Sequence, residues 1–142
     1  MAITQALASS FKQELLQGVH NFSASTGDTF KIALYTSSAT LSSATTAYTT
    51  SGETTGTGYT AGGQTLTNLG VSLSGTTAYL SFDNVTWTTA TITAAGALIY
   101  NSSKSNKAVA ILSFGGSYSS TAGNFTVTYP ANTSTTAIII LN

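Results

Sequence analysis

Apolar residues near the N-terminus recur every four positions. They are Ile3, Leu7, Phe11, Leu15 and Val19. This spacing lines one face of an α-helix and predicts a helix over residues 4–18. Thr4 is the candidate N-cap, because its hydroxyl can accept a free N–H of the first turn, and Gly18 or Asn21 could end the helix. We expect the apolar face either to cover an open part of the β-sheets or to dock on a neighbouring subunit.

After residue 20 the apolar period changes to two, which is typical of β-strands. Alternation over Phe30–Tyr35 predicts a half-buried strand. Further strands are expected at 69–73, 78–82, 85–87, 91–93, 97–100, 107–114, 125–129 and 137–141. Segments 97–100 and 107–114 are apolar at successive positions, as central strands are, and polar residues 101–106 join them as a hairpin loop. Three consecutive isoleucines, Ile138–Ile140, predict a last strand buried on both faces.

About eight short strands separated by Gly, Ser and Asn turns define the expected fold class. It is all-β, an antiparallel sandwich or small barrel with one N-terminal amphipathic helix. The 142 residues suffice for a single β-rich domain, 1–142, in which residues 1–20 form a helical arm.

Residues 36–65 form a long stretch rich in Thr, Ser and Gly, and its only aromatic residues are Tyr48 and Tyr59. A loop of this length inside a compact domain is usually functional or mobile. A short strand over residues 47–50 is one candidate element within it.

The composition removes several classes of function from consideration. Charged residues make up 6% of the chain, and four Lys are matched by four Asp and Glu. A nucleic-acid binder or a protein of anionic membranes needs clustered Lys and Arg, so neither partner is expected. No apolar run is long enough for a spanning helix, and the absence of Cys excludes disulfides and zinc fingers. So few charges favour association with other chains, although a Ser/Thr-rich β-domain would have the same composition.

The residues that could carry chemistry are few. The glycine spacing in 56–61 fits a dinucleotide fingerprint, but no strand precedes it and no helix follows it, so no cofactor is expected. His20 is the only imidazole, and no Gly-x-Ser-x-Gly motif accompanies it. We expect His20 to be a polar residue at the end of the helix and not a catalytic base.

The carboxylates are scattered along the chain, at Glu14, Asp28, Glu53 and Asp83. Glu14 is expected to be solvated beside Lys12, and Asp28 and Asp83 to lie in turns. This set predicts neither a glycosidase pair nor a metal site, so an enzyme is not expected.

Aromatic residues offer one binding alternative. Trp87 with Tyr79, Tyr100 or Tyr118 could form a platform on which a sugar stacks, although such residues also fill ordinary β-cores. A carbohydrate-binding module is therefore the second alternative function.

Several segments carry a family resemblance. They are Ser10–Leu16 (SFKQELL), Phe30–Thr36 (FKIALYT), Gly56–Gly63 (GTGYTAGG), Gly96–Asn101 (GALIYN) and Asn124–Pro130 (NFTVTYP). In this order they resemble a group of small virion structural proteins of tailed bacteriophages, and the resemblance spans most of the chain. In size and character the chain is most similar to capsid decoration, or cement, proteins.

The resemblance implies a non-enzymatic protein without cofactors that sits on the exterior of the virion. Its partners would be further copies of itself, as a homotrimer or other symmetric cluster, and the phage major capsid protein, whose lattice it would brace. A tail, neck or fibre component is the first alternative. Candidate partner contacts lie on the helix face and in the 36–65 loop; they are Leu7, Phe11, Leu15, Tyr48 and Tyr59.

Overall fold

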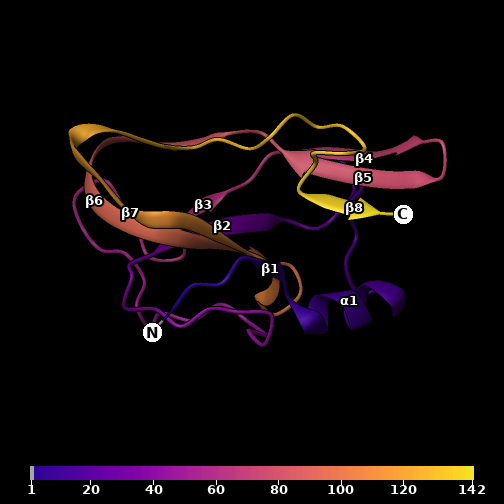
Figure 1. Cartoon of the computed structure of the whole chain (residues 1–142), viewed down its shortest axis with the longest axis horizontal. Helices are drawn as coiled ribbons and strands as arrows, with labels where there is room; N and C mark the ends of the chain where they lie inside the picture. Colours follow the sequence, from indigo (N-terminus) through magenta and orange to yellow (C-terminus); the bar gives the residue numbers. More distant parts are fainter. Residues whose placement is uncertain (1) are drawn as a thin grey trace.

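A computed structural model describes residues 2–142. Its elements are β1 (Ala6–Leu7), α1 (Ser9–Leu16), β2 (Phe30–Tyr35), β3 (Gln64–Thr65), β4 (Asn68–Ser74), β5 (Thr77–Phe82), β6 (Val85–Asn101), β7 (Lys107–Val127) and β8 (Ile139–Leu141). They form a large antiparallel sheet in the order β1-β7-β6-β2-β3 and a small one in the order β4-β5-β8 (Figure 1). The all-β class with one short helix is therefore confirmed. The small-barrel alternative is wrong, because the strands remain in two open sheets.

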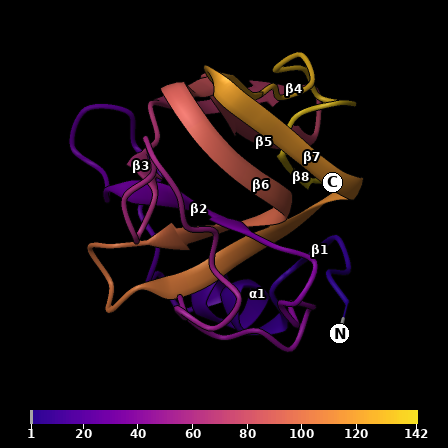
Figure 2. The same ribbon diagram turned by 90° about the vertical axis from the view of Figure 1, so that its left-hand side faces the viewer.

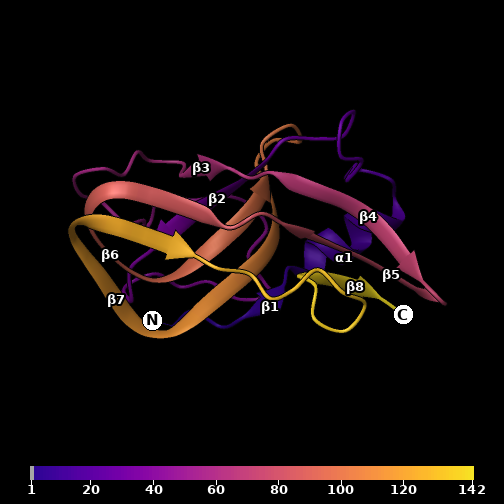
Figure 3. The same cartoon turned by 90° about the horizontal axis from the view of Figure 1, so that it is seen from above.

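One long hairpin dominates the structure. The segments 85–87, 91–93 and 97–100 are parts of the single strand β6, and 107–114 and 125–127 are parts of β7. The two strands pair from Val85–Val127 to Asn101–Lys107, and the register shifts at four places between these ends. Such β-bulges bend a strand. The hairpin accordingly turns back on itself at the end remote from the small sheet, so that its two halves lie in different layers (Figures 1 and 3).

Glycine is required where the bent hairpin meets the N-terminal segment. A Cβ added at Gly96 would lie 2.5 Å from the carbonyl oxygen of Leu112 and 2.8 Å from the side chain of Ile3. Both distances are too short for a carbon contact. Only glycine fits at position 96, because the neighbouring segments of the chain lie too close to leave room for a side chain.

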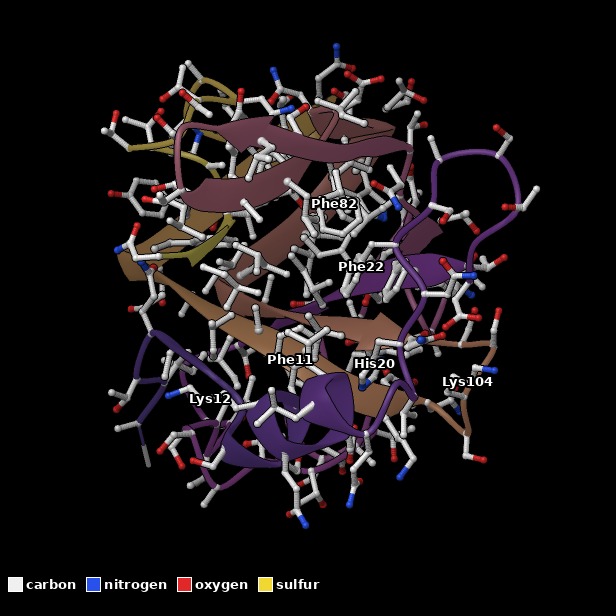
Figure 4. All side chains as sticks on the ribbon, turned by 90° about the vertical axis from the view of Figure 1, so that its right-hand side faces the viewer. Phe11, Lys12, His20, Phe22, Phe82 and Lys104 are labelled. Carbon is white, nitrogen blue, oxygen red and sulfur yellow. The ribbon has the colours of Figure 1, made fainter. Side chains whose placement is uncertain are left out.

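A row of packed aromatic rings forms the part of the core between α1 and the small sheet. Phe22 and Phe30 stack with their centroids 4.4 Å apart, Phe11 meets Phe22 edge-on at 5.9 Å, and Phe82 lies 5.9 Å from Phe30. Figure 4 shows Phe11, Phe22 and Phe82 in this order from the helix upward. In β2 every residue except Lys31 is buried, so the expected half-buried strand is wrong: both of its faces are covered.

The helix is shorter than the apolar spacing predicts. Residues Ala6 and Leu7 pair with β7, so the helix begins only at Ser9, and its N-cap is Ala8 in place of Thr4. Its C-terminal end agrees with expectation. Gly18 has a φ of 72° and donates its N–H to the Leu15 carbonyl, which is the geometry of a glycine that ends a helix. Figure 2 shows α1 below the large sheet, which it covers with Phe11.

Two further expectations need correction. Residues 47–50 form no strand; Ala47 makes an isolated bridge to Lys107, and the only regular element in the 36–65 loop is β3. The last strand, β8, is not buried on both faces. It pairs with β5 alone at the edge of the small sheet; Ile139 is buried on one face, whereas Ile140, which points to the other face, is only half-buried, and Leu141 at the strand end is exposed.

The close approach at Gly96 yields a prediction. We expect Gly96→Ala to lower the free energy of unfolding by about 2–3 kcal/mol, because the new methyl group must displace a backbone carbonyl. Gly116→Ala is the matched control, since a Cβ there meets nothing within 4 Å. Urea titration of both variants measures the difference, and equal stabilities would contradict the packing at Gly96.

Candidate functional site

A polar cluster ties the N-terminal segment to the turn between β6 and β7. His20 is only 7% exposed; its Nε2 donates to Oε2 of Glu14 at 2.7 Å, and its Nδ1 accepts from Nδ2 of Asn101 at 3.0 Å. The Asn101 amide donates its second hydrogen to Oδ2 of Asp28 at 2.8 Å. The NH2 group of Asn101 can only donate hydrogen bonds, so Nδ1 of His20 must be the acceptor. The ring proton that donates to Glu14 therefore lies on Nε2.

Asp28 is the second carboxylate of this cluster, besides Glu14. Burial alone would raise its pKa, but the hydrogen bonds from the Asn101 side chain and the Asn21 backbone N–H, together with the nearby Lys104 charge, hold the pKa below its usual value. The Asn21 N–H lies 2.9 Å from Oδ2, and the Lys104 ammonium lies 3.8 Å from Oδ1. Asp28 is therefore held as an anion that joins two distant segments.

Glu14 is not the solvated residue expected from its neighbour Lys12. It is half-buried, accepts from His20, and has the Lys107 ammonium 3.5 Å from Oε1. The helix is thereby connected through Glu14 to the first residue of β7.

The arrangement at His20 resembles part of a catalytic triad, but its geometry is structural. A triad needs a serine hydroxyl on the ring nitrogen that faces away from the carboxylate. The buried Asn101 amide occupies that nitrogen. Both ring nitrogens therefore serve internal contacts.

A second cluster fixes the long 36–65 loop, and its centre is Glu53. One carboxylate oxygen accepts from the Tyr48 hydroxyl at 2.6 Å; the other accepts from the Tyr59 hydroxyl and the Gly62 N–H, each at 2.7 Å. The Tyr59 hydroxyl in turn accepts the Leu34 N–H of β2 at 2.9 Å. The loop is thus held against the large sheet by its one carboxylate.

The tyrosines of this cluster remain neutral. Burial, followed by the hydrogen bond to the Glu53 carboxylate, raises the pKa of Tyr48 and Tyr59 far above the usual value. Burial likewise raises the pKa of Tyr100, whose hydroxyl donates to the Gly62 carbonyl at 2.6 Å. A phenol that stays protonated can donate steadily to Glu53, which suits a structural anchor.

The predicted partner contacts occupy two different places. Phe11 is 1% exposed and belongs to the core, and Leu7 and Leu15 are half-buried beside it. Tyr48 and Tyr59 are also half-buried and bind Glu53. The structure does not bring the two groups together, and contact of either group with a partner stays a prediction.

The structure does not provide the expected aromatic platform for a sugar, because Trp87, its main residue, is buried. Trp87 is 2% exposed and packs edge-on against Phe125, with their centroids 6.5 Å apart. Tyr100 is also buried. Tyr118 alone of the four proposed residues is largely exposed, next to a shallow hollow of about 320 Å³ that Phe114 and Asn124 also line.

Exposed aliphatic side chains lie together on one face of the small sheet. Val71 opposes Leu80, and Leu73 and Leu141 both oppose Ala78, so the three exposed side chains point to the same face. We call this surface the apolar end; its members are Val71, Leu73 and Leu141. Leu73 is 72% exposed, and Leu16 in the last turn of α1 is 92% exposed. A groove of about 90 Å³ beside them is lined by Leu15, Phe22 and Ile139 among others. Figure 4 faces this end, with the small sheet above the helix.

Charged residues are missing from the sheet that carries the apolar end. The sequences of β4, β5 and β8 (NLGVSLS, TAYLSF and IIL) contain no Asp, Glu, Lys, Arg or His. Alternation over 69–73 did predict a strand, but a pattern of period two does not tell which face is covered. The alternation in the sequence therefore did not predict that this apolar face is exposed.

Among residues 2–142, no group of three or more His, Cys, Asp or Glu side chains is placed to hold a metal ion. No helix in this range is both long enough and apolar enough to cross a membrane.

Comparison with models of known protein families, with curated protein sequences and with solved structures found no match for this chain. The class that the structure itself defines is a mostly-β protein of two open antiparallel sheets. Its most distinctive surface is the uncharged apolar end.

The Glu53 cluster generates a prediction about stability. We expect Glu53→Ala to lower the free energy of unfolding by about 2–4 kcal/mol, because two hydroxyls and one N–H lose their acceptor. Glu53→Gln keeps one acceptor oxygen, and we expect it to lose about half as much. Urea unfolding monitored by tyrosine fluorescence measures both; a neutral Glu53→Ala variant would show that the loop is held by other contacts.

The lowered pKa of Asp28 predicts a pH dependence. A depressed pKa stabilises the folded chain above the ordinary carboxyl value of about 3.9, and this stabilisation is lost as the pH falls through the folded-state pKa. We expect Asp28→Asn to be less stable than the wild type at pH 7 and equally stable near pH 2. Unfolding curves at both pH values measure the gap, with the exposed Asp83→Asn as control. A gap that is unchanged at low pH would refute the assignment.

Proposed function

We propose that this chain is a non-enzymatic virion structural protein of a tailed bacteriophage, specifically a capsid decoration protein. In this role it binds the outer surface of the major capsid lattice and braces the head. The observation that carries the structural role is the apolar end, an uncharged surface of exposed aliphatic side chains. Exposed patches of this kind are typical of surfaces that contact other proteins.

The use of the charged side chains supports the same proposal. Five of the eight, Glu14, Asp28, Glu53, Lys104 and Lys107, take part in contacts within the chain. Glu14, Asp28, Lys104 and Lys107 connect the N-terminal segment to the hairpin turn and its flanking strand, and Glu53 holds the long loop together. These ionisable groups thus stabilise the fold of the domain. A domain that serves as a building block of an assembly needs a stable fold of this kind.

The setting of this role comes from the resemblance of the sequence to small phage virion proteins. On a symmetric lattice each modest contact is repeated many times, so a small uncharged domain can add stability without a strong single site. The partners would be the major capsid protein and further copies of the chain, on the exterior of the virion.

The proposal is tested by the amount of the chain in separated phage parts. We expect quantitative mass spectrometry of purified heads to find it in a fixed, high ratio to the major capsid protein. Low copy number in tail fractions alone would contradict the decoration role and favour a tail, neck or fibre component. Absence from all particle fractions would refute a virion protein of any kind.

Attachment to bare heads needs a variant that leaves the fold intact. Removal of residues 1–20 is unsuitable, because it deletes β1 and takes Phe11 out of the core. Surface substitutions at the apolar end avoid this difficulty, since their side chains already face solvent.

A further inference from the structure

We propose that the apolar end joins two copies of this chain, whose β4 strands pair antiparallel across a two-fold axis. The small sheets of the two copies would then form one continuous six-stranded sheet. This inference rests on the proposed function only for its biological setting, because self-association is measured on the purified chain alone.

The outer edge of β4 is free over the second half of the strand. In the part of the chain that the structure describes, β4 pairs with β5 alone and forms the border of the small sheet. Near its start the border is covered: Nδ2 of Asn68 donates to the Phe22 carbonyl, and Ala24 lies against Gly70. From Val71 to Ser74 the outer side of the strand is open. An uncovered edge presents backbone N–H and C=O groups that a second strand can pair with.

The exposed side chains of β4 are placed so that a second β4 strand would cover them. Val71 and Leu73 oppose Leu80 and Ala78 of β5, so both point to the same face of the sheet, and both are more than half exposed. A two-fold axis at Ser72 places Val71 of one copy directly across from Leu73 of the other. Residues opposite each other in antiparallel strands share a face, so this register covers both apolar side chains at once.

The small sheet has no charged side chain that would oppose contact with a second copy. In a two-fold contact the same patch meets itself, so any charged residue near the axis would face an equal charge. The three strands of the small sheet carry none. Exposed sheet edges are commonly protected by Lys, Pro or a bulge, and residues 71–74 contain none of these protections.

A second copy fits this surface better than other occupants. A partner with a charged surface would bury its charges against aliphatic side chains without compensation. The other border of the small sheet, β8, has only three residues, so it offers a shorter edge than β4. The contact is small, and we therefore expect a dimer that dissociates at concentrations on the order of micromolar.

The test is the mass of the purified chain in sedimentation velocity over a range of concentrations. We expect the wild type to approach twice its 14.4 kDa mass at about 200 µM, well above the expected dissociation constant. Leu73→Lys adds a charge beside the axis and should weaken dimerisation at least tenfold. Tyr118→Lys, an equally drastic change at an exposed residue of β7 in the other sheet, should leave the dimer intact. Far-UV circular dichroism and thermal melting confirm that each variant is folded.

A monomeric wild type at the highest concentration, or a dimer unaffected by Leu73→Lys, overturns the inference. A trimer also overturns it, because two paired β4 edges leave no edge for a third copy. A dimer that is absent from phage particles supports the inference while refuting the proposed function, so the two failures are distinguishable.

Discussion

The backbone pairing of β6 with β7 is the interaction on which the rest of this structure depends. Because the register shifts bend the hairpin, its two halves lie in different layers. The N-terminal segment and the long loop are both attached to this element: the Ala8 N–H donates to the Val109 carbonyl, and residues 47 and 57 form bridges to residues 107 and 91. Its bend requires close contacts, such as the one at Gly96, that leave no room for a side chain.

The ionisable groups of the chain stabilise this arrangement at two points. The cluster around His20 and Asn101 attaches the N-terminal segment to the hairpin turn, and the cluster around Glu53 attaches the long loop to β2. Each cluster saturates its polar atoms internally, which is how buried polar groups become compatible with folding. The exposed face of the small sheet, by contrast, is apolar and uncharged, and such a surface suits contact with another protein.

The sequence predicts the position of β2, Phe30–Tyr35, but not that both faces of this strand are covered. It fails where Thr, Ser and Gly break the alternation, so β6 and β7 look like several short strands. The four-residue apolar spacing starts before the helix does, because Leu7 belongs to a strand that happens to share the spacing. Glu53 could have been recognised as the only carboxylate in a loop with two tyrosines. The exposure of β4 could not, since it depends on which elements cover the small sheet.

The central claim is that this domain acts through contacts of its surface within a symmetric assembly. Its most direct test is a cryo-electron microscopy reconstruction of a phage particle that contains the chain. The account predicts density for the domain on the outer head surface, with β4 in contact with a neighbouring chain. Density that places the domain elsewhere in the particle, or that leaves the apolar end facing solvent in every copy, would contradict it.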